Sequence, residues 1–82
     1  MDEPLTVQSR SELARFVAGL AADLETNPAG WENTTLPAFL DALSRYLDDL
    51  PGWCRNNAPK VDPEAAQWQL MAVALSGASV YE

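Results

Sequence analysis

The sequence contains no histidine and a single cysteine, Cys54, among its 82 residues. The lack of histidine removes the commonest general base and the commonest metal ligand in proteins. One cysteine cannot form a disulfide within the chain, and without histidine it cannot complete a zinc site of the usual type. We therefore expect a protein of a reducing compartment that is not an enzyme and has no metal site and no cofactor.

Basic residues and long apolar runs are also scarce. Five Lys and Arg stand against 12 Asp and Glu, which gives a net charge of −7. This charge repels phosphate backbones and anionic lipid surfaces, so we expect neither nucleic acid nor membrane as a partner. No apolar run has the length of a membrane-spanning helix, and the acidic start Met1-Asp2-Glu3-Pro4 lacks the apolar region of a signal peptide. These features predict a cytoplasmic protein that attracts basic partners.

Glycine is sparse and scattered, so the sequence offers no glycine-rich phosphate loop. A chain of this length, with 48% apolar residues, is expected to form one small domain over residues 1–82 with a modest core. Without a disulfide or a metal, its stability has to come from close packing of helices.

Apolar residues recur at helical spacing in three segments. They predict a mostly α fold, a compact bundle of three helices over about residues 9–24, 35–50 and 62–76. Ser9 and Glu12 have the spacing of a capping box at the start of the first helix, and its apolar face comprises Leu13, Phe16, Val17, Leu20 and Leu24. Asp62-Pro63-Glu64 is a typical start for the third helix, and Gly77 is its expected C-cap. The third helix is apolar around most of its circumference, which is typical of a central element.

The middle helix has the clearest signals. Thr35 is its expected N-cap, because its hydroxyl can accept a hydrogen bond from a backbone N–H of the first turn. Pro51-Gly52 is expected to end it, since proline cannot continue the helical hydrogen-bond ladder. We expect the core to centre on Phe39 and Leu43, within a stripe of apolar residues at three- and four-residue spacing: Leu36, Phe39, Leu40, Leu43, Tyr46, Leu47 and Leu50.

Residues outside these stripes also carry expectations. Trp31 is expected to cover the seam between the first two helices, with its indole N–H bonded to a carbonyl. Asn33 is expected to order its loop through a bond from its side chain to the backbone. We expect Trp68 in the core. The terminal segments, Leu5-Thr6-Val7 and Ser79-Val80-Tyr81, are candidates for a short strand pairing.

The block Trp31-Glu32-Asn33-x-Thr35-Leu36-x-x-Phe39-Leu40 resembles a small bacterial domain family of unknown function. That family also closes with an aromatic-containing helix and a Tyr-Glu ending, which correspond here to Trp68-Gln69-Leu70 and Tyr81-Glu82. The chain departs from the family pattern at Pro37-Ala38, where acidic residues are frequent, and at Trp53-Cys54, where an aromatic pair is common. The resemblance implies a compact, mostly helical domain and implies no reaction.

The small size, the acidic surface and the missing catalytic groups favour a non-catalytic protein-binding module. One concrete version is an immunity- or antitoxin-like protein that inhibits a basic partner by charge complementarity. The candidate partner-binding residues lie on the polar side of the second predicted helix and just beyond it: Asp41, Asp48, Asp49, Trp53 and Arg55.

Two other functions remain open from the sequence. The chain could be a structural or accessory subunit that acts as a homodimer, with an interface covering Trp53 and the loop near Val61. A carboxylate-dependent enzyme is disfavoured, because neighbouring helix residues such as Asp48 and Asp49 point about 100° apart and do not converge on one atom. Cys54 next to Arg55 is a candidate for a thiol of lowered pKa, although a small, half-buried apolar residue is the favoured interpretation.

Overall fold

Three α-helices and two short 3₁₀ helices form the fold in a computed structural model that describes residues 3–81. The order is η1 (Pro4–Thr6), α1 (Arg10–Thr26), η2 (Pro28–Gly30), α2 (Leu36–Asn57) and α3 (Trp68–Ala78). The predicted mostly α bundle of three helices is confirmed. Met1 and Asp2 of the acidic start, and Glu82 of the Tyr-Glu ending, lie outside the described residues.

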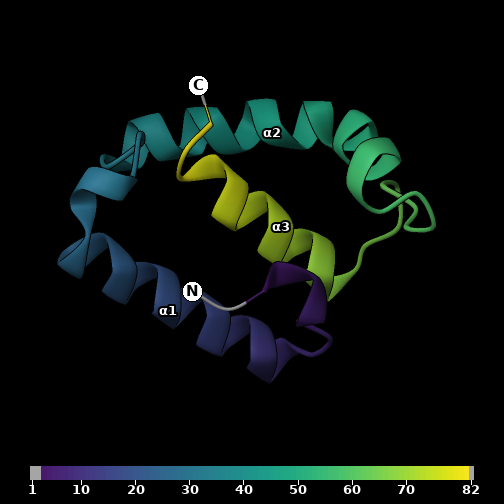
Figure 1. The fold of residues 1–82 in the computed structure, drawn as a ribbon, viewed down its shortest axis with the longest axis horizontal. Helices are drawn as coiled ribbons and strands as arrows, with labels where there is room; N and C mark the ends of the chain where they lie inside the picture. Colours follow the sequence, from purple (N-terminus) through teal and green to yellow (C-terminus); the bar gives the residue numbers. More distant parts are fainter. Residues whose placement is uncertain (1–2, 82) are drawn as a thin grey trace.

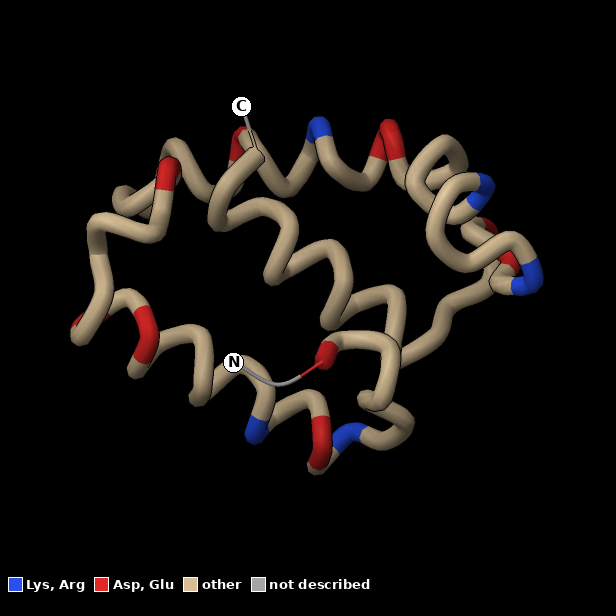
Figure 2. Tube along the Cα trace, in the orientation of Figure 1, with Lys and Arg blue, Asp and Glu red and all other residues tan. Residues whose placement is uncertain are grey.

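Helix α3 lies between α1 and α2, as Figure 1 shows, and α1, α2 and η1 all pack against it. The three helices form a flat slab that measures 34 × 27 × 18 Å across its Cα atoms. Figure 2 shows the charged residues on the other segments and none on α3. The expectation that the third, most apolar helix is the central element is therefore confirmed. A helix that is apolar on most sides is stabilised when neighbours cover it on several sides.

Helix α1 begins with the predicted cap. The Oγ of Ser9 accepts a hydrogen bond of 3.1 Å from the N–H of Glu12. The Glu12 carboxylate accepts in return from the N–H of Gln8, so the reciprocal bond is displaced by one residue from the usual capping box. The helix ends at Thr26, two residues beyond the prediction. Its buried face holds Leu13, Phe16 and Leu20, whereas Val17, which was expected on this face, is 42% exposed.

Helix α2 is longer than the sequence predicts. Thr35 caps it as expected, because its Oγ1 accepts from the N–H of Ala38 at 3.3 Å. The prediction that Pro51-Gly52 ends the helix is wrong, since the helix continues to Asn57. Pro51 removes one ladder hydrogen bond, but the added turns bury Cys54 and pack Trp53 against the same apolar cluster. This burial outweighs the cost of the proline.

The core consists of two buried clusters and is not centred on Phe39 and Leu43 as predicted. One cluster joins η1, α1 and α3, and comprises Val7, Leu13, Phe16, Leu20 and Ala72; the other joins α2 and α3, and comprises Leu50, Cys54, Leu70 and Val73. The predicted centre is wrong, because Phe39 and Leu43 are only half-buried. The apolar stripe of α2 is wider than α3 can cover, so its outer members Leu36, Leu40 and Leu47 are exposed.

Helix α3 begins at Trp68, six residues later than predicted. Asp62 forms the expected type of side-chain bond, because its Oδ1 accepts from the N–H of Glu64 at 2.9 Å. This bond closes a turn, and no helix begins there. Gly77 lies inside the helix and is not its C-cap. A Cβ at Gly77 would overlap the ring of Tyr46, so the glycine is needed for the close approach of α2. Trp68, expected in the core, is 41% exposed at the start of the helix.

The terminal segments do not pair as strands, and residues 3–81 contain no strand. The carbonyl oxygen of Ser79 instead accepts from the N–H groups of Glu32 and Asn33, at 2.9 and 3.0 Å. The side-chain amide of Asn33 donates to the carbonyl oxygens of Ala78 and Tyr81, both at 2.8 Å. Asn33 does donate from its side chain to backbone carbonyls, as expected, but the partners belong to the C-terminal segment and not to its own loop. These bonds hold Tyr81 beside α2.

Trp31 covers the seam between α1 and α2, as predicted. Its half-buried indole donates to the Asp23 carboxylate of α1 at 2.7 Å, a carboxylate in place of the expected carbonyl. Its ring stacks against Phe39 of α2, with centroids 6.2 Å apart. The loop before α2 is thereby fixed to both outer helices.

Candidate functional site

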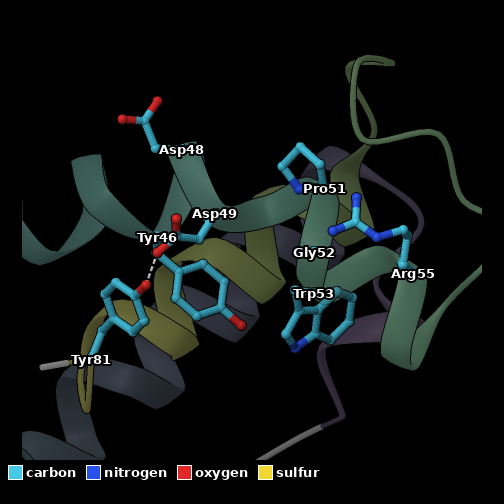
Figure 3. A pocket seen from close by; sticks show the side chains of 8 residues that line it. All are labelled: Tyr46, Asp48, Asp49, Pro51, Gly52, Trp53, Arg55 and Tyr81. Carbon is cyan, nitrogen blue, oxygen red and sulfur yellow. Dashed lines mark hydrogen bonds between the residues drawn. The ribbon is translucent and has the colours of Figure 1, made fainter.

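An open hollow of about 520 Å³ lies beside the C-terminal half of α2, and Figure 3 shows it from close by. We call it the α2 pocket. The structure brings four of the five predicted partner-binding residues to this hollow, and leaves Asp41 outside it. The lining residues come from α2 and from the C-terminal segment: Tyr46, Asp48, Asp49, Pro51, Gly52, Trp53, Arg55 and Tyr81.

Two features of the fold build the α2 pocket. Tyr46, Asp49 and Trp53 follow one another at three- and four-residue spacing, so they share one flank of α2. Trp53 belongs to this flank only because the helix continues through Pro51. Tyr81 completes the hollow from the other end of the chain, where Asn33 holds its backbone.

The aromatic rings of the pocket contact one another and a cation. Tyr46 and Tyr81 meet edge to face, with ring centroids 5.2 Å apart and an interplanar angle of 80°. The guanidinium of Arg45 lies 5.3 Å from the centroid of the Tyr81 ring, within the range of a cation–π interaction. Trp53 is half-buried, with part of its ring against the Leu50–Val73 cluster and part lining the hollow.

The three predicted carboxylates have different surroundings. The hydroxyl of Tyr81 donates a hydrogen bond to Oδ2 of Asp49. Asp48 points away from Asp49 in Figure 3, and within residues 3–81 it has no hydrogen bond or ion pair. Asp41 forms an ion pair of 3.2 Å with Arg45, one helical turn further along. Only Asp48 therefore presents an unpaired carboxylate at the pocket.

Burial changes the pKa of two groups in this region, one that lines the pocket and one in the core next to it. Burial raises the pKa of Tyr46, with a smaller contribution from nearby Cys54. Burial also raises the pKa of the Cys54 thiol, and the negative charge of Asp62 adds to this effect. Cys54 is 2% exposed. The favoured interpretation of Cys54 as a small apolar residue is confirmed, because a buried thiol of raised pKa is a poor nucleophile.

Two other kinds of site are absent from the described part of the chain. Residues 3–81 hold no group of three or more acidic or cysteine side chains that could bind a metal ion. In the same range, no helix combines the length and the apolar character that a crossing of the bilayer requires.

Sequence reasoning missed three residues of this region. Tyr46 is predicted in the apolar stripe and does pack against the Leu50–Val73 cluster, but it also lines the pocket, which the stripe does not predict. Tyr81 and Arg45 join the pocket region through contacts across 32 and 36 positions of the sequence. No local pattern signals contacts over such distances.

The sequence model of a protein family described as "Family of unknown function (DUF7660)" matches residues 9–82. The match includes all three α-helices and every residue that lines the α2 pocket. None of the curated proteins and none of the solved structures compared with the chain matches it.

Proposed function

Because the chain belongs to the DUF7660 family of unknown function, we propose a function from its own surface: a non-catalytic protein-binding module. The α2 pocket is its contact site, and a basic segment of a partner protein is the ligand. An immunity- or antitoxin-like inhibitor, which blocks its partner in the cytoplasm, is one concrete version of this proposal.

The proposal depends on one observation. Three aromatic rings line one open hollow, and the unpaired carboxylate of Asp48, another lining residue, points away from these rings. Tyrosine and tryptophan are enriched among the residues that dominate binding energy at interfaces. Ring faces attract Lys and Arg side chains, and the carboxylate of Asp48 adds an opposite charge at the outer edge of the hollow. A cationic side chain is therefore the ligand that this chemistry fits.

The charge of the whole chain supports the same type of ligand. A net charge of −7 speeds the approach of a basic partner and slows that of an acidic one. Arg45 does not oppose this, because its guanidinium already interacts with Asp41 and the Tyr81 ring. Arg55 lies at the rim over Gly52 and offers donors to acceptor groups of the partner.

Three features support a binding role over a catalytic one. The carboxylates of Asp48 and Asp49 diverge, and that of Asp49 accepts from Tyr81. The thiol of Cys54 is buried and has a raised pKa. The sequence has no histidine that could act as a general base. The aromatic rings and Arg55 that line the pocket can contact a ligand but do not form a set of catalytic groups.

Capture of partners from an extract of the cells that make the protein tests this function. Four baits are compared by quantitative mass spectrometry: the parent, Trp53→Ala, Asp48→Lys and Glu25→Lys. Loss of a central aromatic contact or reversal of a contact charge is expected to lower recovery of the partner by about 30-fold. Glu25→Lys is the matched control, because it makes the same charge change on an exposed position of α1.

The parent and Glu25→Lys should recover the same basic protein, and the two pocket variants should lose it. Circular dichroism of each bait verifies that the helices are intact. Equal recovery by all four baits, or equal loss with Glu25→Lys and Asp48→Lys, would show that the α2 pocket is not the contact site.

A further inference from the structure

Large apolar side chains are exposed together on the flank of α2 that faces away from the pocket. Leu36, Leu40 and Leu47 are 70, 53 and 50% exposed, and their spacing of four and seven residues aligns them along the helix. Tyr46 and Asp49 lie on the opposite side of the buried strip of α2. The helix thus presents an apolar row on one flank and the pocket on the other.

Two hollows extend this row across the slab. In the first, Leu36 and Leu75 lie together with Val17 of α1. In the second, Leu47 lies together with Met71 of α3. Met71 and Leu75 are one helical turn apart on the same side of α3. Helical spacing places Leu40 beside Leu47 and Trp68 beside Met71. We call this apolar region over the three helices the open face; its exposed large side chains are Val17, Leu36, Leu40, Leu47, Trp68 and Met71.

The open face carries little charge in a strongly acidic protein. No charged residue lines the hollow of about 330 Å³ between α1 and the start of α2. Helix α3, the middle of the face, has no charged residue, and Glu64 lies only at the edge of the second hollow. A basic partner would find almost no carboxylate to pair with here, whereas a second copy of the chain would meet almost no like charge.

We propose that the open face binds the open face of a second copy of this chain and forms a symmetric dimer. The broad side of the slab measures 34 × 27 Å, which leaves room for the ~800 Å² that each partner contributes to a standard interface. Leu36, Leu40, Leu43 and Leu47 alternate at spacings of four and three residues, the pattern by which two helices pack side by side.

The dimer leaves the aromatic wall of each α2 pocket accessible, because Tyr46 and Trp53 lie on the other flank of α2 from the leucine row, next to Tyr81. Two pockets in one assembly would allow a partner with two basic segments to bind with higher avidity. The dimer is independent of the proposed function, since it is measured on the purified chain alone.

The molar mass of the purified full chain, measured by light scattering and sedimentation over a range of concentrations, tests the proposal. We expect twice the chain mass of 8.9 kDa, with dissociation on dilution. The dimer should strengthen when ionic strength rises from about 0.1 M to about 1 M, because salt screens the repulsion between two acidic chains. A mass of one chain at the highest soluble concentration would overturn the proposal.

Substitutions locate the interface. Leu40→Glu places two carboxylates in an interface related by two-fold symmetry and is expected to weaken the dimer by about 30-fold or more. Leu36→Glu is a second variant that should fold normally, because an acidic residue is favourable at a helix N-terminus. Val80→Glu is the matched control, since Val80 is 52% exposed, like Leu40, but precedes Tyr81 at the pocket side.

Circular dichroism shows whether each variant keeps its helices. We expect Leu40→Glu and Leu36→Glu to give folded monomers and Val80→Glu to keep the parent's dimer constant. A dimer that all three variants leave unchanged, or that Val80→Glu weakens as strongly as Leu40→Glu, would refute the open face as the interface.

Discussion

Phe16→Ala is expected to lower the free energy of unfolding by about 3–5 kcal/mol, the usual cost of removing a buried aromatic ring. Phe16 is 2% exposed and lies in the cluster that joins η1, α1 and α3. At about 0.05–0.15 kcal/mol per residue, a chain of 82 residues has a total stability of only about 4–12 kcal/mol. The variant should therefore lose a large fraction of its total stability and unfold at a much lower urea concentration than the parent.

Urea denaturation followed by circular dichroism measures this effect. Arg15→Ala is the control on the neighbouring position, where the side chain is exposed and lies outside the open face, and it should cost less than about 1 kcal/mol. If the two variants unfold at the same urea concentration, the buried side of α1 is not the side that holds Phe16.

Asn33→Asp is expected to cost about 2–4 kcal/mol, although it changes the shape of the side chain very little. The Asn33 amide donates to the carbonyl oxygens of Ala78 and Tyr81. An ionised carboxylate has no donor, so the variant loses both bonds and brings a negative charge towards two carbonyl oxygens. The C-terminal segment should then detach, and Tyr81 should leave the α2 pocket.

Thermal unfolding and the fluorescence of Tyr81 and Trp53 report the two consequences separately. Asn57→Asp is the matched control, because the Asn57 amide donates to one carbonyl oxygen, that of Trp53, at an exposed position. Its cost should stay near 0.5 kcal/mol. A melting temperature of Asn33→Asp that equals the parent's would mean that these bonds do not hold the C-terminus.

Local signals predicted the helices and their starts better than their ends. Ser9 and Thr35 were identified as caps because a cap depends on three or four consecutive residues. Pro51 misled the prediction, because the cost of a proline is local whereas the burial of Cys54 against α3 is a tertiary contact. Asp62 misled it in the same way, since the same side-chain bond can begin a helix or close a turn.

The residues of the candidate site were predictable from the sequence where they belong to one helix. Asp48, Asp49, Trp53 and Arg55 were chosen from their charge and aromatic character, and the structure places all four around one hollow. Their roles differ for reasons outside the sequence pattern: Asp49 is engaged by Tyr81, and Asp48 is not. The contribution of Tyr81 depends on Asn33, and a bond across 48 positions leaves no periodic trace in the sequence.

The burial of the middle helix also depended on its neighbour. The stripe of seven apolar residues predicts one core face, but of the seven only Leu50 is buried, and the other buried residues of α2, Ala42 and Cys54, lie outside the stripe. The exposed members of that stripe, Leu36, Leu40 and Leu47, form part of the open face. An apolar pattern thus predicts which side chains avoid water, and it does not distinguish burial within one chain from burial between two chains.

A titration of the ¹⁵N-labelled chain with two short blocked peptides, one centred on arginine and one on glutamate, tests the proposed binding site most directly. We predict saturable shifts with the arginine peptide at the Trp53 indole N–H and at the amides of Asp48 and Tyr81, and none with the glutamate peptide. Shifts of equal size with both peptides, or shifts centred on Leu40 and Met71 of the open face, would contradict the assignment of the α2 pocket as the site for a basic partner.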